Sequence, residues 1–259
     1  MRASGTTLFV EGQSRLHGCH PFSKLFFIPL TGVAAYVEPG TVQAAVFLIV
    51  LNMTLAAAAG VLPTAWKITW RTLLPLALFM LPIHGFLYPG NHTPLFSRQG
   101  LTLYAEGLRF AGTILAQLAA VLSASLLFVL TTHPADLIAA LTKAGWPSSI
   151  AYLLGSPLLM LPAMRDRTGV IRAAQQARGL DSGANILGRI RSLPPLVAPL
   201  VLGAFAEIEQ RAIALELRGF HSSASKTSLR RVPDSTAQRL VRRLFLVATV
   251  FLILYRIMI

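Results

Sequence analysis

The stretch around which this chain is organised reads AQQARG at residues 174–179 and ALELRG at residues 214–219. Each copy begins with alanine, has an amide or an acid at its third place and ends in Arg-Gly, and the two arginines are 40 residues apart. The residues before each copy alternate between polar and apolar with the period of an α-helix. Since glycine readily adopts the left-handed backbone that stops a helix, each copy predicts a sharp helix end with an exposed arginine.

A single Arg-Gly helix end would carry little functional information. The helix dipole favours arginine at a C-terminus, and glycine is a common residue just beyond it. Two matched copies, each closing an amphipathic helix, are much harder to explain by structure alone. Arginine keeps its charge, and its planar fork binds a carboxylate or backbone carbonyls through two bonds. We therefore interpret the two ends as contact points for a soluble partner that has two equivalent subunits, such as a motor dimer.

The composition indicates an integral membrane protein. Of the 259 residues, 54% are hydrophobic and only 13% are charged, whereas a soluble domain carries about 25% charge. The formal net charge is +13, and residues 133–243 hold fifteen Lys and Arg against seven Asp and Glu. Beside apolar runs, this excess predicts a cytoplasmic segment by the positive-inside rule. Nucleic-acid binding is not expected, because no aromatic residues are interleaved with the Ser/Arg-rich segment 221–243.

The apolar runs predict an all-α fold with about five transmembrane helices, within a range of four to six. The expected spans are residues 21–38, 41–61, 72–88, 101 or 104 to 130, and 240–259. With the N-terminus inside, the loop that contains Lys67 and Arg71 is cytoplasmic and the weakly charged loop 89–100 lies outside. No cleavable signal peptide is expected, because the first apolar run follows a polar start of more than twenty residues.

The domain plan follows from these runs. We expect a tail at 1–20, a membrane domain at 21–132 with about four spans, a cytoplasmic domain of long amphipathic helices at 133–222, a basic linker at 223–239 and a C-terminal transmembrane helix at 240–259. Within the cytoplasmic domain, residues 148–162 predict a separate helix lying at or under the bilayer. Amphipathic helices are expected from 163 to 179 and from 193 to 219, joined by a loop at 181–192.

No catalytic constellation is evident. The chain lacks the Gly-x-x-x-x-Gly-Lys-Ser/Thr loop of ATPases, and its single cysteine, Cys19, excludes an internal disulfide. No catalytic residue, metal site or cofactor is expected. His84 lies within an expected span, where we predict an interfacial or interhelical hydrogen bond rather than a ligand site. Glu106 and Arg109 are expected to pair with each other or to extend toward the membrane surface.

Further motifs accompany the two Arg-Gly copies, and together they resemble a known family. They are His20-Pro-Phe-Ser-Lys-Leu25, Thr131-Thr-His-Pro-Ala-Asp-Leu137 with Leu141 and Gly145-Trp-Pro147, Pro162 before the first copy, and Pro194, Pro195 and Pro199 before the second. The chain resembles the CbiQ-like transmembrane T component of energy-coupling factor transporters over roughly residues 20–220. It departs from the family pattern at His20, where an acidic residue is usual, and at Leu217, where alanine is usual.

The resemblance implies a non-catalytic scaffold in a bacterial-type cytoplasmic membrane. Two ABC-type ATPase subunits would dock on its coupling helices, and a separate S component would bind the cargo, a vitamin or a transition-metal ion. The residues that would contact the ATPases are Ala177, Arg178, Gly179, Leu217, Arg218 and Gly219, supported by Gln176 and Glu216. Two alternatives stand beside this hypothesis. A self-sufficient secondary transporter or channel would show repeats among its spans, and a membrane-embedded enzyme would show paired carboxylates or histidine clusters.

Overall fold

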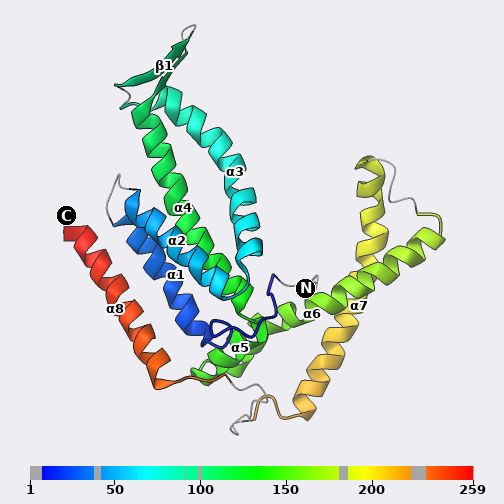
Figure 1. The fold of residues 1–259 in the computed structure, drawn as a ribbon. Helices are drawn as coiled ribbons and strands as arrows, with labels where there is room; N and C mark the ends of the chain where they lie inside the picture. Colours follow the sequence, from blue (N-terminus) through cyan, green and yellow to red (C-terminus); the bar gives the residue numbers. More distant parts are fainter. Residues whose placement is uncertain are drawn as a thin grey trace. The chain divides into compact units, whose positions relative to one another are not determined.

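The structure is a computed structural model that describes residues 8–37, 42–90, 92–98, 101–180, 186–222 and 232–258. Within these ranges it contains eight helices and one short antiparallel hairpin (Figure 1). The chain divides into two compact units, Met1–Trp146 with Arg230–Ile259, and Pro147–Leu229. We call them the membrane unit and the crossed-helix unit. The boundary between the first two expected spans, at residues 38–41, and most of the expected linker 223–239 lie outside the described residues.

The membrane unit contains α1 (Pro21–Tyr36), α2 (Gln43–Ala58), α3 (Leu62–Leu87), β1 (Pro94–Arg98), β2 (Leu101–Tyr104), α4 (Ala105–Thr131), α5 (Pro134–Lys143) and α8 (Thr236–Met258). The crossed-helix unit contains α6 (Ser148–Ala177) and α7 (Ile186–Leu217). Among the described residues, three helical segments are long and apolar enough to cross a membrane. They are Leu62–Leu87, Ala105–Thr131 and Ser192–Leu217. The expected helical architecture is thus confirmed, apart from the hairpin.

Helix α4 is the centre of the membrane unit, and α1, α2 and α3 all pack against it. Its buried residues are mostly small, which lets neighbouring helices approach closely. Asn52 of α2 uses this proximity: its Nδ2 donates to the carbonyl of Ala120 at 3.0 Å and to Ser123 Oγ at 2.9 Å. Gln117 of α4 donates to the carbonyl of Ala35 in α1 at 3.1 Å. Buried side-chain amides therefore hold both α2 and α1 against α4.

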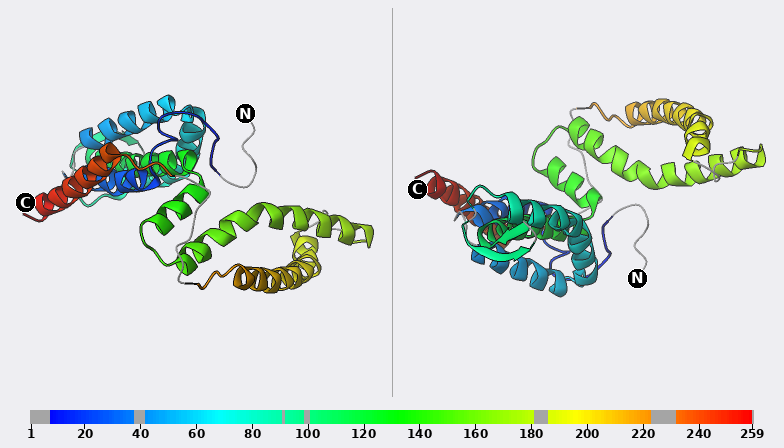
Figure 2. Two further views of the ribbon diagram at one scale, coloured as in Figure 1. Left: turned by 90° about the horizontal axis from the view of Figure 1, so that it is seen from below. Right: turned by 90° about the horizontal axis from the view of Figure 1, so that it is seen from above.

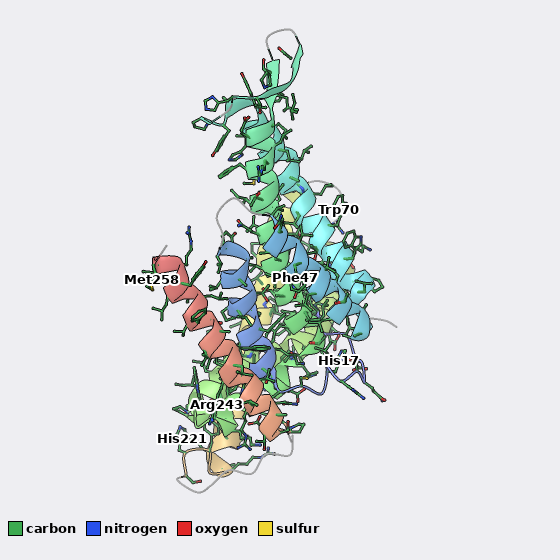
Figure 3. All side chains as sticks on the ribbon, turned by 60° about the vertical axis from the view of Figure 1, so that its left-hand side comes forward. His17, Phe47, Trp70, His221, Arg243 and Met258 are labelled. Atoms are coloured by element: carbon green, nitrogen blue, oxygen red, sulfur yellow. The ribbon has the colours of Figure 1, made fainter. Side chains whose placement is uncertain are left out.

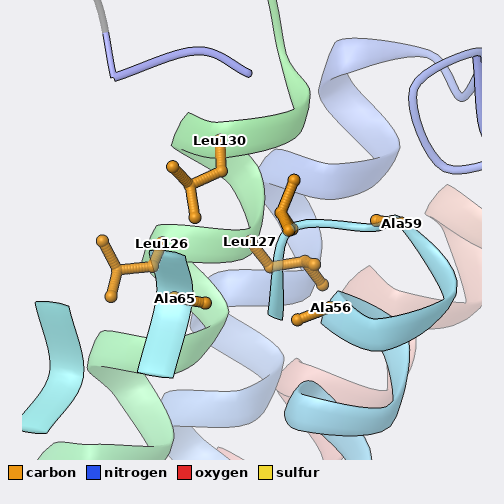
Figure 4. Packing of buried hydrophobic residues seen from close by; sticks show 7 residues of the cluster. Ala56, Ala59, Ala65, Leu126, Leu127 and Leu130 are labelled. Atoms are coloured by element: carbon orange, nitrogen blue, oxygen red, sulfur yellow. The ribbon is translucent and has the colours of Figure 1, made fainter. Parts of the chain in front are cut away.

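The end of α4 near Thr131 is held in a second way. Lys24 of α1 is buried, and its Nζ donates to the carbonyl of Thr131 at 2.8 Å, which satisfies a carbonyl in the last turn of α4. An apolar cluster lies beside this bond where α2 turns into α3 (Figure 4). Its members are Ala56, Ala59, Val61, Ala65, Leu126, Leu127 and Leu130.

Two local expectations for this unit were wrong. Lys67 and Arg71 lie on α3 rather than in a loop, because Pro63 occupies the first turn of a helix, where its missing N–H costs nothing. Trp66 and Trp70 stack beside them with ring centroids 6.3 Å apart, and Trp70 points outward (Figure 3), as is typical of a membrane interface. The expected outer loop 89–100 is largely a hairpin, in which Ser97 pairs with Thr102.

His20 stands where the resembled family usually has an acidic residue, and the structure explains why histidine can serve there. His20 is the N-cap of α1, and its Nδ1 accepts the backbone N–H of Phe22 at 3.3 Å, the bond that an acidic cap would make. His133 caps α5 in the same manner, since its Nδ1 accepts the N–H of Ala135 at 3.1 Å. Each histidine precedes a proline at the first helical position. An imidazole therefore replaces a carboxylate here without loss of the cap.

Candidate functional site: the two Arg-Gly helix ends

The crossed-helix unit consists of two long helices that are more continuous than the sequence predicts. Helix α6 runs unbroken from Ser148 to Ala177, so the separate helix expected at 148–162 is wrong. Helix α7 begins at Ile186 rather than at 193, and three prolines lie inside it. A proline removes one backbone bond and bends a helix, but packing against a neighbour allows the helix to continue.

The first Arg-Gly end closes α6 as predicted. Arg178 is the C-cap, and Gly179 follows with φ +88°, the left-handed region that glycine enters at no steric cost. The N–H of Gly179 donates to the carbonyl of Gln176 at 2.9 Å, and that of Leu180 donates to the carbonyl of Gln175 at 3.0 Å. This pair of bonds is the Schellman motif, which satisfies the last carbonyls of a helix.

The second end has the same geometry. Gly219 has φ +69°, and its N–H donates to the carbonyl of Glu216 at 2.9 Å. The N–H of Phe220 donates to the carbonyl of Leu215 at 3.0 Å, so α7 also ends in a Schellman motif. The sequence-level repeat is therefore a repeat of backbone conformation as well.

Every residue selected from the sequence at the two ends is exposed: Gln176, Ala177, Arg178, Gly179, Glu216, Leu217, Arg218 and Gly219. No hydrogen bond or ion pair joins the guanidinium group of Arg178 or Arg218 to another residue that the structure describes. Leu217, which departs from the alanine of the first copy, is 84% exposed. Its larger side chain therefore meets no obstacle within the described chain.

The two helices cross in opposite directions (Figure 1), and three contacts set their register. Gln175 near the end of α6 bonds to Pro195 early in α7, Arg167 pairs with Glu207 near the middle, and the ring of Tyr152 early in α6 meets Phe220. The Arg-Gly ends consequently lie at opposite extremes of the crossed pair, as the views in Figure 2 also show. The sequence does not reveal the partner of Glu207, because the register of two helices is not a local property.

The other candidate residues form no ligand site. His84 Nδ1 bonds to the carbonyl of Met80 in its own helix at 3.0 Å, and its ring packs 5.3 Å from that of Phe110 in α4. Of the two expected alternatives, the interhelical hydrogen bond is replaced by this ring contact, and the interfacial hydrogen bond stays a prediction. Glu106 accepts bonds from the N–H and hydroxyl of Thr93 rather than pairing with Arg109. The part of the chain that the structure describes contains no cluster of three or more metal-ligating side chains.

A unit of apolar helices, joined in one chain to crossed helices with matched exposed arginines, defines a class of protein: a helical membrane protein with a second unit of crossed helices. The chain belongs to the CbiQ family, described as a cobalt transport protein, which matches residues 12–229. It is a transmembrane T component of energy-coupling factor transporters. Family membership, predicted from the sequence, is thus confirmed.

Curated relatives are similar over most of the chain, and each is an energy-coupling factor transporter transmembrane protein EcfT. The protein from Brevibacillus brevis is 32% identical over 238 residues, covering 86% of this chain and 87% of the relative. That from Limosilactobacillus fermentum is 29% identical, covering 94% and 97%. The Lactococcus lactis subsp. cremoris protein is 26% identical, covering 95% and 96%.

Proposed function

We propose that the two Arg-Gly ends dock two ABC-type ATPase subunits, one at each end of the crossed pair, on the cytoplasmic side of a bacterial-type cell membrane. Residues 177–179 and 217–219 enter grooves of the ATPases, with Gln176 and Glu216 at the rims. Movement of the ATPases then reaches the membrane through α6 and α7 and acts on a separate S component. That component selects the cargo, a vitamin or a transition-metal ion.

The observation that carries this proposal is the doubled helix end with its exposed arginine. A Schellman motif satisfies the backbone of the last turn internally, so each guanidinium group is left to contact another molecule. Since the two ends are alike in backbone and exposure, one type of groove suits both. A pair of identical or homologous ATPases supplies two such grooves.

The proposal treats α7 as a coupling helix although it contains a segment, Ser192–Leu217, that is long enough to cross a bilayer. Helix α7 carries Glu207, Glu209 and Arg211 within one turn and a half, and each charge costs about 2.5–3.5 kcal/mol at the centre of a bilayer. We assign the membrane spans to α1, α2, α3, α4 and α8. Helices α1 and α2 have 16 residues each, about 24 Å at 1.5 Å per residue, so flanking residues complete these two spans.

Charge reversal at both ends tests the proposal. The variant Arg178→Glu with Arg218→Glu is co-expressed with its ATPases and S component, and the ATPase that co-purifies is measured. We expect binding to fall at least about 30-fold, because removal of one partner from a buried charged contact costs 2 kcal/mol or more. Arg172→Glu is the matched control, since Arg172 is an exposed arginine of α6 away from the end. Undiminished ATPase binding by the double variant would reject the proposal.

A further inference from the structure

The first Arg-Gly end is fastened to α7 by a proline-dependent bond. Gln175 accepts the Schellman bond with its carbonyl while its side-chain Nε2 donates to the carbonyl of Pro195 at 3.1 Å. In a regular helix that carbonyl would accept from the N–H of residue 199. Residue 199 is proline and has no N–H. The acceptor on α7 is therefore available to Gln175 because of Pro199.

The middle of the crossed pair is fastened by charge. Glu207 of α7 has a side chain only 14% exposed, and its Oε2 lies 2.6 Å from Nη1 of Arg167 in α6. Its other oxygen accepts from Nε of Arg211, one turn further along α7, at 2.9 Å. One carboxylate thus joins two helices and shares its charge between two guanidinium groups.

The second Arg-Gly end is fastened to α6 by an aromatic contact. Phe220 follows Gly219 in the Schellman motif, and its ring meets that of Tyr152 edge to face, with centroids 5.5 Å apart. Such aromatic pairs contribute about 0.5–1.5 kcal/mol beyond the area they bury. Each Arg-Gly end is accordingly connected to the opposite helix within two or three residues of its arginine.

We propose that Gln175 and Glu207 are positioning residues that hold the two Arg-Gly ends at one fixed separation, so that both ATPases act on a single rigid pair of helices. The proposal rests on the proposed docking of ATPases at these ends. The physical reason is that α6 and α7 bury little against each other, since many of their apolar side chains are exposed. Without the polar links, the crossing angle would be poorly determined and the ends would move independently.

The separation is measured by pulsed electron–electron double resonance on the full chain in nanodiscs. Spin labels are attached to cysteines introduced at the exposed Ala173 and Ala212 in a Cys19→Ser background. We expect one narrow distance peak in the parent and loss of that single peak in Glu207→Gln. The matched control is Glu209→Gln, because Glu209 is an exposed glutamate of α7 with no ion pair to the described residues.

Four further variants separate positioning from a general loss of charge or fold. The triple exchange Arg167→Glu, Glu207→Arg and Arg211→Glu restores both attractions with reversed signs, so it should recover the narrow peak. Gln175→Leu removes the bond to the Pro195 carbonyl and should broaden the distance distribution. Pro199→Ala supplies an N–H that competes for the same carbonyl and should broaden the distribution in the same way. Pro194→Ala, which does not affect that carbonyl, should leave it narrow. An unchanged distribution in both Glu207→Gln and Gln175→Leu would overturn the proposal.

The consequence for transport is read in the assembled complex with its ATPases and S component in liposomes. In Glu207→Gln we expect the ATPases still to bind, because both arginines remain, while the amount of cargo imported per ATP hydrolysed falls. A coupling ratio equal to that of Glu209→Gln would reject the role of Glu207. This outcome differs from failure of the docking proposal, which would appear as full ATPase binding by the double arginine variant.

Discussion

The two units of the molecule differ in how the helices inside each of them are held together. In the membrane unit, small buried residues of α4 let α1, α2 and α3 approach closely, and Ala111, Ala120 and Leu130 are fully buried. Among the described residues of the crossed-helix unit, only Ala151, Gly155 and Ser192 are buried. Its large apolar side chains, such as Leu202 at 70% exposure, remain uncovered. The membrane unit is thus specified by its interior, whereas the crossed pair depends on a few directed links and leaves much of its apolar surface exposed.

The largest effect is expected where this interior is tightest. Ala120→Leu places three additional carbon atoms at a fully buried position of α4 and separates Asn52 from the carbonyl it binds. Overpacking costs about 1–3 kcal/mol, and the lost bonds bring the expected loss of unfolding free energy to about 3 kcal/mol. Denaturation with sodium dodecyl sulfate in mixed micelles, followed by circular dichroism, measures it.

The same substitution in the other unit provides the comparison. Ala163 is exposed on α6, and Ala163→Leu should change the unfolding free energy by less than about 0.5 kcal/mol, as surface substitutions usually do. If the two leucine variants were equally destabilised, the contrast between a packed interior and a loosely packed helix pair would be wrong.

Local sequence signals predicted the features that depend on local physics. Glycine after arginine predicted both Schellman ends, because the left-handed conformation is a property of a single residue. Sequence reasoning failed where helix boundaries depended on packing. Residues 148–162 and 163–179 were expected to form separate helices, yet α6 continues through Pro157 and Pro162.

Two other features could not be predicted from local sequence: one depends on how two helices pack, and in the other a strand pattern coincides with high hydropathy. The pairing of Arg167 with Glu207 requires the antiparallel register of α6 and α7, which no local pattern encodes. Residues 101–104 read Leu-Thr-Leu-Tyr, a strand-like alternation, but their hydropathy made them look like the start of a span. The structure assigns them to β2. Hydropathy shows that a segment is apolar enough to enter a membrane, and it does not distinguish a short strand from a helical turn.

A medium effect is expected at the helix ends themselves. Gly179→Ala must place a Cβ in the left-handed region, which costs about 1 kcal/mol, although no atom lies within 4 Å of that Cβ. We expect the Leu180 amide, which donates to Gln175, to exchange with deuterium about fivefold faster, the factor that corresponds to about 1 kcal/mol. Gly179→Asn is the matched control, because asparagine tolerates this conformation. Equal exchange rates in alanine and asparagine variants would show that backbone strain does not control this end.

The smallest effect is expected at the junction of α1 and α8 in the membrane unit. The backbone N–H of His20 donates to Gln238 of α8 at 3.0 Å, and Asp234 pairs with Arg242 at 3.0 Å. Burial, and then the positive charge of Arg242, lower the pKa of His20 below its usual 6.5. The hydrogen bond from Arg242 lowers the pKa of Asp234. Both groups therefore favour the fold at neutral pH, and protonation of either one destabilises it.

These two groups act in separate pH ranges, which makes the contribution of His20 measurable. The stabilisation from neutral His20 is complete above about pH 6.5, its unfolded value, and is lost as the pH falls through the lower folded value. The contribution of Asp234 begins to be lost only as the pH approaches its unfolded pKa of about 3.9, because its folded pKa is lower still. Between pH 7.5 and pH 5 we expect the free energy of unfolding to fall by about 0.5 kcal/mol, since protonated Nδ1 no longer accepts the Phe22 N–H. The melting temperature should fall accordingly. His20→Asn keeps the cap without titrating and should remove this part of the decline, whereas His92→Asn, at an exposed histidine, should leave it intact. A decline as steep in His20→Asn as in the parent would place the acid sensitivity outside this junction.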